Sequence, residues 1–218
     1  MVKFLSSAAL AALLATGAAH ATPLTLFLDA GGGNTLTIVD GDANDDSPIA
    51  NHIQIQSGTT LGGFVFGSNS QLAIQSDTGL LDSNFHLLGS GTLIVQVSKD
   101  DYAAPFGQVG ITDDFSLTNI GNSIAYESYL STSNTMFGTE FLIHSNTATS
   151  ILDNEFVSVG INLSGPYALT HFYTISQDAG EQSNFVHSTV TTPEPETLAL
   201  FGLGLLGLGV LSRRRKLG

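Results

Sequence analysis

The 218-residue sequence has no cysteine, no tryptophan and only six lysine and arginine residues. Without cysteine the chain forms no disulfide, offers no thiolate nucleophile and cannot build a cysteine-bound zinc site. Without tryptophan it lacks the largest aromatic surface for stacking on sugar rings. The scarcity of positive charge excludes an ordinary nucleic-acid-binding surface, which needs clustered Lys and Arg. Stability must therefore come from burial, hydrogen-bonded sheet or bound ions.

The few cations are also unevenly distributed. Lys99 is the one base between Thr22 and Thr192, and 17 of the 19 acidic residues lie in the same range, which gives it a net charge of −16. Such acidity favours solubility and the binding of divalent cations, and plain solvation of the protein surface is the alternative.

The N-terminus has the pattern of a secretory signal peptide. Lys3 precedes the apolar run Phe4–Leu14, and Ala19 and Ala21 stand at the spacing that a signal peptidase needs. We expect residues 1–21 to be cleaved after Ala21, since an uncleaved anchor would need a longer apolar run. Residues 22–192 are then long enough for one exported domain with a core, followed by a C-terminal segment at 193–218.

The exported body alternates apolar and polar residues with a period of two. In Thr92–Ser98, Leu93, Val95 and Val97 fall on one face, and Phe156–Leu163 repeats the pattern. This is typical of half-buried strands. Further strands are predicted at Thr25–Leu28, Thr35–Val39, His52–Gln56, Leu61–Phe66, Gln71–Gln75, Phe115–Ile120, Ser123–Leu130, Leu169–Ile175 and Val186–Thr191.

Glycine, proline, asparagine and aspartate punctuate these runs at short intervals. Clear turn signals include Gly31–Asn34, Gly89–Gly91 and Asp178–Gly180. Short strands with frequent turns predict an all-β fold, an antiparallel β-sandwich or jelly roll. One short helix is predicted within Asn146–Glu155.

One acidic turn has the spacing of a calcium loop. Asp40, Asp42 and Asn44 offer oxygen ligands at positions one, three and five, as in an EF-hand loop. Asp45 replaces the expected glycine, however, and no glutamate stands at the twelfth position. Calcium is therefore the one cofactor that the sequence suggests, and a bare acidic turn is the alternative.

Other chemistry-bearing residues form no recognisable catalytic pattern. The doublets Asp100–Asp101 and Asp113–Asp114 are interpreted as solvated turn residues, since neighbours in a strand point to opposite faces. His144 and His171 could meet across a sheet, although no two body histidines have the short spacing of a zinc site. A Ser–His–Asp triad assembled by the fold stays open. Aromatic side chains available for sugar contact, with core packing as the alternative, are Tyr102, Phe106, Tyr126 and Tyr129.

The C-terminus has three features in a fixed order. Pro193, Glu194 and Pro195 precede the glycine-studded apolar run Leu198–Leu211, and Arg213, Arg214, Arg215 and Lys216 follow it. At 1.5 Å per residue the run would reach about 21 Å as a helix, short of the ~30 Å hydrocarbon core, so it would span only with local thinning of the membrane. The cations would be held on the cytoplasmic side.

These features resemble the PEP-CTERM sorting signal of Gram-negative bacteria; an ordinary tail anchor is the alternative. The resemblance implies that a membrane-bound sorting protease of the exosortase type handles the tail. It also implies passage through the inner membrane to the cell surface or extracellular matrix, as in biofilm proteins. We expect a structural or interaction role and no enzymatic activity, with a glycan hydrolase as the enzymatic alternative. A Ca²⁺- or carbohydrate-binding module, with extracellular polysaccharide as partner, is the alternative function.

Overall fold

The computed structural model of the chain describes residues 23–66, 73–77, 79–103, 107–151 and 153–193. These residues form twelve strands and no helix, and the strand pairs are antiparallel, which confirms the predicted all-β class. The strands are β1 (Thr25–Asp29), β2 (Thr35–Val39), β3 (His52–Ile53), β4 (Thr60–Leu61), β5 (Phe64–Phe66), β6 (Ala73–Asp77), β7 (Leu80–Tyr102), β8 (Gly107–Asn119), β9 (Ser123–Ser131), β10 (Phe141–Ala148), β11 (Glu155–Leu163) and β12 (Tyr167–Pro193).

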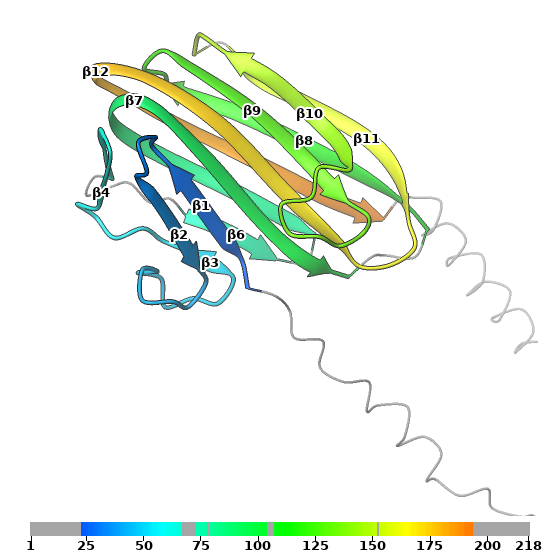
Figure 1. The fold of residues 1–218 in the computed structure, drawn as a ribbon. Coiled ribbons are helices and arrows are strands. Elements are labelled where there is room, and N and C mark those ends of the chain that lie inside the picture. The colour runs from blue at the N-terminus through cyan, green and yellow to red at the C-terminus, as the bar shows by residue number, and fades with distance from the viewer. Residues whose placement is uncertain (1–22, 67–72, 78, 104–106, 152, 194–218) are drawn as a thin grey trace, which may run out of the picture.

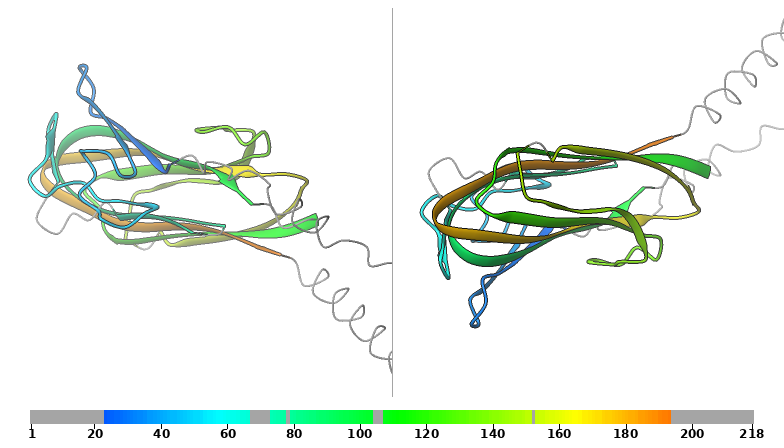
Figure 2. Two further views of the ribbon diagram at one scale, coloured as in Figure 1. Left: turned by 90° about the horizontal axis from the view of Figure 1, so that it is seen from below. Right: turned by 90° about the horizontal axis from the view of Figure 1, so that it is seen from above.

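Two long strands, β7 and β12, run side by side and bend together. The bend in β7 lies at Gly89 and Gly91, which have φ angles of 146° and 111°. The register of β12 shifts between Gln177 and Glu181, opposite the same place. Each strand therefore begins in one layer and ends in the other, and the layers lie face to face in the views of Figure 2.

Each layer is built around one half of the β7–β12 pair. Residues 167–177 and 91–102 lie in the first layer, whose order is β10-β9-β12-β7-β1-β2 (Figure 1). Residues 181–193 and 80–89 lie in the second, between β11-β8 on one side and β6-β3 and β5 on the other. The arrangement is the predicted β-sandwich.

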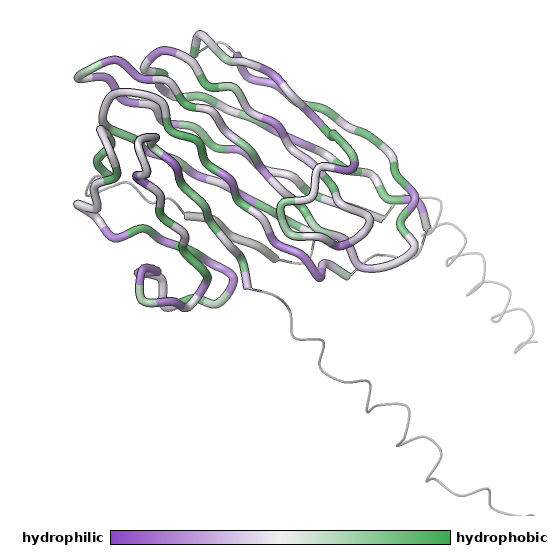
Figure 3. The backbone as a smooth tube through the Cα atoms, in the orientation of Figure 1, coloured by the Kyte–Doolittle hydropathy of each residue, from purple (hydrophilic) through white to green (hydrophobic). Residues whose placement is uncertain are grey.

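The core fills the space between the layers. Apolar and polar segments alternate along the long strands in Figure 3, and the side chains of Leu93, Val95 and Val97 are fully buried. Phe85 and Phe185 stack with ring centroids 4.5 Å apart. Each such buried side chain stabilises the fold by about 1.5–3 kcal/mol relative to exposure.

Strand β10 was anticipated only through the expectation that His144 lies in a sheet, without bounds, and the helix predicted within Asn146–Glu155 is wrong. In the described part of that range, Asn146–Ala148 ends β10 and Glu155 begins β11. The pattern of β10 is irregular because its register with β9 shifts between Leu142 and His144. That bulge leaves Ile143 and His144 both buried, where regular alternation would expose one of them.

Candidate functional site

A buried polar network lies between the two layers, centred on Asp113. This residue lies in the middle of β8 and is 0% exposed, so its interpretation as a solvated turn residue was wrong. Its neighbour Asp114 points to solvent. The two carboxylates of the doublet thus face opposite sides of the sheet, as the period of a strand requires.

Three side chains donate hydrogen bonds to the Asp113 carboxylate. His187 Nε2 and His144 Nδ1 lie 2.8 and 2.9 Å from Oδ2, and the Thr189 hydroxyl donates to Oδ1. Burial alone would raise the pKa of Asp113, but His187 and His144 lower it well below its usual value. Asp113 is therefore a buried, ionised and fully hydrogen-bonded carboxylate.

His144 bridges Asp113 to the surface. Its Nε2 lies 2.7 Å from Glu155 Oε2, while its Nδ1 faces Asp113. Because both acceptors are carboxylates, both ring nitrogens carry hydrogen and the ring is an imidazolium. The hydrogen bond to Asp113 raises the pKa of His144 against the opposing effect of burial, and Glu155 adds to the rise.

His171 and His187 lie behind Asp113 as a stacked pair of rings. His171 Nε2 donates to Thr189 Oγ1 at 2.8 Å, and its Nδ1 lies 3.0 Å from Ser83 Oγ. The Tyr173 hydroxyl lies 2.9 Å from His187 Nδ1. Burial lowers the pKa of His171 well below its usual value, which keeps this ring uncharged.

The donor atoms of Asp113, His171 and His187 lie within 4.8 Å of one another, which raises the question of a metal site. The two imidazoles are stacked with centroids 4.1 Å apart and planes inclined by 14°. Stacked rings hold their in-plane nitrogen lone pairs in two separate, nearly parallel planes, whereas a tetrahedral site needs lone pairs that converge on one ion. The donor atoms are also engaged with protein groups. We therefore interpret the cluster as a hydrogen-bonded network.

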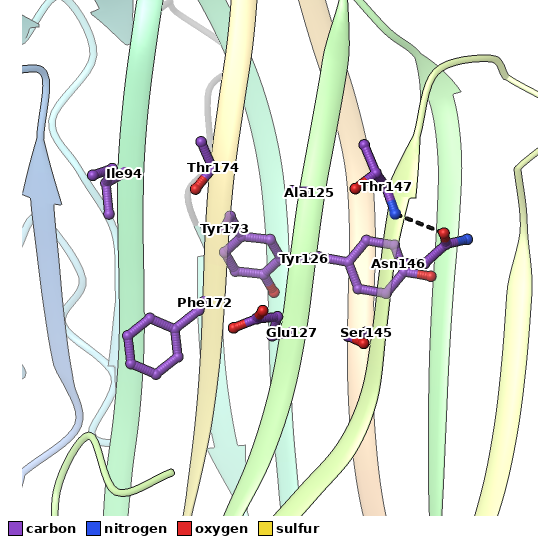
Figure 4. Close-up of a pocket in the computed structure, with 10 residues that line it drawn as sticks. All are labelled: Ile94, Ala125, Tyr126, Glu127, Ser145, Asn146, Thr147, Phe172, Tyr173 and Thr174. Atoms are coloured by element: carbon purple, nitrogen blue, oxygen red, sulfur yellow. Dashed lines mark hydrogen bonds between the residues drawn. The ribbon is translucent and has the colours of Figure 1, made fainter.

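A second feature is an open pocket of about 390 Å³ on the outer face of the first layer. Figure 4 shows its residues on four neighbouring strands, β7, β12, β9 and β10. They are Ile94, Ala125, Tyr126, Glu127, Ser145, Asn146, Thr147, Phe172, Tyr173 and Thr174. Tyr126 and Tyr173 turn their rings to the core side, where they pack on Phe115 and Phe85.

The outward side chains of the pocket combine apolar and polar groups. Phe172 packs edge-on against Tyr129, with centroids 5.7 Å apart, and Ile94 is 38% exposed. Tyr129 donates to Glu127 Oε2 at 2.8 Å. Burial and this hydrogen bond raise the pKa of Tyr129, which keeps its hydroxyl a donor at neutral pH. Within the described residues, no hydrogen bond occupies the exposed hydroxyls of Ser145, Thr147 and Thr174.

The loop between β9 and β10 covers the face beside the pocket. Phe137 N donates to Ser98 Oγ at 2.9 Å, and Thr170, which points to the same face as Phe172, is fully buried. The loop therefore covers the first layer beside the pocket, while all ten residues that line the pocket lie on strands.

The predicted calcium loop uses its carboxylates to hold its own backbone. Asp42 accepts from the backbone N–H of Asn44 at 2.6 Å, and Asp40 accepts from that of Asn51 at 2.8 Å. Asp45 accepts from three further backbone N–H groups, each at 2.9 Å. Calcium binding by Asp40, Asp42 and Asn44 stays a prediction.

The other predicted residues are distributed as follows. Tyr102 and Tyr126 are buried, and Tyr129 lies beside the pocket. Pro193 ends β12, opposite Val109. Ala19, Ala21, Phe106, Glu194, Pro195, Arg213, Arg214 and Arg215 lie outside the described residues. Among the described residues, no helix has the length and apolar character needed to cross a membrane.

Residues 191–216 match the PEP-CTERM protein-sorting motif. The match confirms the resemblance seen in the sequence: the chain carries this sorting signal and is an exported protein, directed through the membrane to the cell surface or extracellular space. It supports processing by an exosortase. The description of that enzyme simply as a protease was a mischaracterisation, since the matched motif is one of protein sorting.

No curated protein matches the chain. Among solved structures, it is similar to TmCBM61 in complex with β-1,4-galactotriose (14% identity, 60% of this chain and 81% of that chain, TM-score 0.30). It is also similar to the CBM22-1 xylan-binding domain of Paenibacillus barcinonensis Xyn10C (8% identity, 64% and 90%, TM-score 0.32). A third similar structure is CBM35 from the same organism (12% identity, 66% and 98%, TM-score 0.28). Likenesses this weak carry no argument about ligands.

Proposed function

We propose that this is a cell-surface or extracellular-matrix protein with an interaction role, and that its body binds a neutral polysaccharide through the outer-face pocket. The observation that carries the proposal is the composition of that pocket. It presents a partly exposed Phe172 beside three hydroxyls that have no partner among the described residues.

The chemistry of a sugar suits these side chains. A pyranose ring has an apolar face, for which Phe172 and Ile94 supply an apolar platform. Its hydroxyls need donors and acceptors around the rim, which Ser145, Thr147 and Glu127 supply. The lining residues span four neighbouring strands, so an extended chain could lie across the pocket.

Charge favours a neutral ligand over an acidic one. The body has a net charge of −16 from Thr22 to Thr192, and the pocket itself carries Glu127. Like charges reduce both the rate of encounter and the affinity, so uronate-rich or sulfated chains would be disfavoured.

The same geometry supports a role without catalysis. Glycoside hydrolysis needs a pair of carboxylates flanking the scissile bond, and Glu127 is the one carboxylate among the ten lining residues. Asp113 is sealed in the core and hydrogen-bonded by three side chains, out of reach of a substrate.

We extend the proposal to processing. Cleavage after Ala21 would release residues 22–192 as the exported domain, and residues 193–218 would hold the chain in the inner membrane until an exosortase acts. Mass spectrometry of the mature protein should then find no peptide from the region after Pro195. Recovery of the intact tail on finished molecules would contradict this step.

The binding proposal is tested with mature protein isolated from the producing cells, on an array of neutral oligosaccharides and on insoluble neutral polysaccharides. Phe172→Ala should weaken binding about tenfold, equivalent to about 1.4 kcal/mol. Phe156→Ala is the matched control, because Phe156 is 67% exposed but lies in the other layer. Failure of folded wild-type protein to bind any of the glycans, or equal binding by the Phe172 variant, would overturn the proposal.

A further inference from the structure

Strand β11 forms an edge of the second layer. It pairs with β8 over its whole length, from Glu155 opposite Phe115 to Leu163 opposite Gly107, without a register shift. No other described strand pairs with its outer side. The backbone N–H and C=O groups that point away from β8, on every second residue, thus form a regular row along this nine-residue strand.

This edge lacks the usual protection against pairing with another chain. Natural edge strands are short, bulged, or carry Lys or Pro. In the first layer β2 has five residues and β10 is bulged, whereas β11 is long and regular and contains no Lys, Arg or Pro. Its side chains are mostly apolar: Val157, Val159 and Ile161 are only half-buried, and Phe156 is 67% exposed.

The single charge of β11 does not oppose pairing. Glu155 stands at the end of the strand, where its carboxylate accepts hydrogen bonds from His144 at 2.7 Å and from Tyr126 at 3.2 Å. Asn146 donates to its other oxygen. The remaining eight residues are uncharged, so the acidic body presents a locally neutral edge.

We infer that β11 pairs with β11 of a second copy of this chain, antiparallel and about a two-fold axis at Val159. This register aligns all nine residues, and it sets Val159 opposite itself and Val157 opposite Ile161 of the second copy. The half-buried apolar side chains of both molecules then form one row. The two second layers would join into one continuous sheet.

The choice of a second copy as the partner of β11 follows from the symmetry of the strand. An isologous contact needs a surface that matches itself under two-fold rotation, and the alternation of β11 about Val159 provides one. The inference is independent of the proposed polysaccharide site, because the pocket lies on β7, β9, β10 and β12 of the first layer. One strand pair buries little surface, so the dimer should be of the weak class.

Cross-linking tests the register directly, because the chain has no native cysteine. Val159→Cys should give a disulfide-linked dimer under mild oxidation, since residues directly opposite in a sheet have Cβ atoms about 4.5–5.5 Å apart. Ser158→Cys is the matched control: its copies would lie diagonally, about 7–8 Å apart, and should cross-link at least tenfold more slowly. Equal cross-linking of the two variants, or none with Val159→Cys, would overturn the inference.

Oligomeric state gives a second readout that needs no glycan. The mature protein should show concentration-dependent dimerisation in sedimentation equilibrium. Val159→Lys should abolish it, while Thr37→Lys on the edge strand β2 should leave it unchanged. Circular dichroism checks that both variants fold. A wild-type monomer at all concentrations, or a dimer that survives Val159→Lys in folded protein, would contradict the pairing.

Discussion

At the scale of single residues, the main finding is how His144 comes to lie against Asp113. The sequence contained both residues, and it suggested that His144 and His171 could meet across a sheet. They join the same network, but through Asp113 and Thr189 rather than directly. The sequence could not predict this, because the β10 bulge that turns His144 inward breaks the alternation from which the inward face of a strand is inferred. Asp113 was missed because Asp–Asp doublets are far commoner in solvated turns than in cores.

The charge on His144 should make stability depend on pH. Its pKa is raised above 6.5 in the fold, so its contribution is full below about pH 6.5 and is lost as the pH rises through the folded-state pKa. His144→Gln, which removes one partner of a buried ion pair, should cost about 3–5 kcal/mol near pH 5.5 and clearly less near pH 9. Thermal melts of both proteins across this range measure the difference.

The control for this prediction is His86→Gln. His86 is only partly buried, and its ring contact with Gln182 is long, at 3.5 Å, so the variant should change the melting temperature little. Asp113 does not add to the difference between pH 5.5 and pH 9. Its pKa is lowered, so it stays ionised over this range, and its contribution to stability is lost only in more acidic solution. A His144 effect that is independent of pH would show that the ring is not held as an imidazolium.

At the scale of elements, most strands were predicted where they lie. β1, β2 and β9 agree with their predicted ranges within one residue. Besides the wrongly predicted helix within Asn146–Glu155, the errors lie in the long strands: Gly89–Gly91 and Asp178–Gly180 were interpreted as turns between strands, whereas they lie inside β7 and β12. A glycine-rich segment can form either a turn that reverses the chain or a bend within one strand. Only the pairing of β7 with β12 shows that these two segments are bends.

The bend in β7 should tolerate no side chain at Gly89. Its φ is 146°, and an added Cβ would lie 2.4 Å from the Gly63 carbonyl oxygen and 2.6 Å from Phe64 Cα. Backbone strain and overpacking together predict that Gly89→Ala lowers the free energy of unfolding by about 2–5 kcal/mol, measured by urea titration. Gly165→Ala, with no atom within 4 Å of its added Cβ, should stay within about 0.5 kcal/mol of wild type. Similar effects of both substitutions would contradict the close packing of the backbone at Gly89 against Gly63 and Phe64.

At the scale of the whole molecule, the sequence identifies the sorting segment and the structure identifies the pocket. The sequence alone identified the sorting signal at the C-terminus, because its features are contiguous along the chain. It could not identify the pocket, because Ile94, Glu127, Ser145 and Phe172 become neighbours only when β7, β9, β10 and β12 pair. The predicted Ca²⁺ loop illustrates the same limit: spacing places oxygens near each other but does not tell whether backbone N–H groups already use them.

The distribution of charge over the whole chain predicts how sorting fails. Four cations follow the apolar run, and the acidic body precedes it, so we expect the positive-inside bias to hold the tip in the cytoplasm while the body is exported. Replacing Arg213, Arg214 and Arg215 by Glu removes that bias and should leave most of the protein unprocessed and absent from the surface. Protease accessibility on intact cells and the mass of the tail would show this.

The matched control replaces the same residues by Lys, which keeps the charge, and should be delivered normally. Normal delivery of the Glu variant would refute orientation by charge, and failure of the Lys variant would show that the sorting enzyme recognises the guanidinium groups themselves.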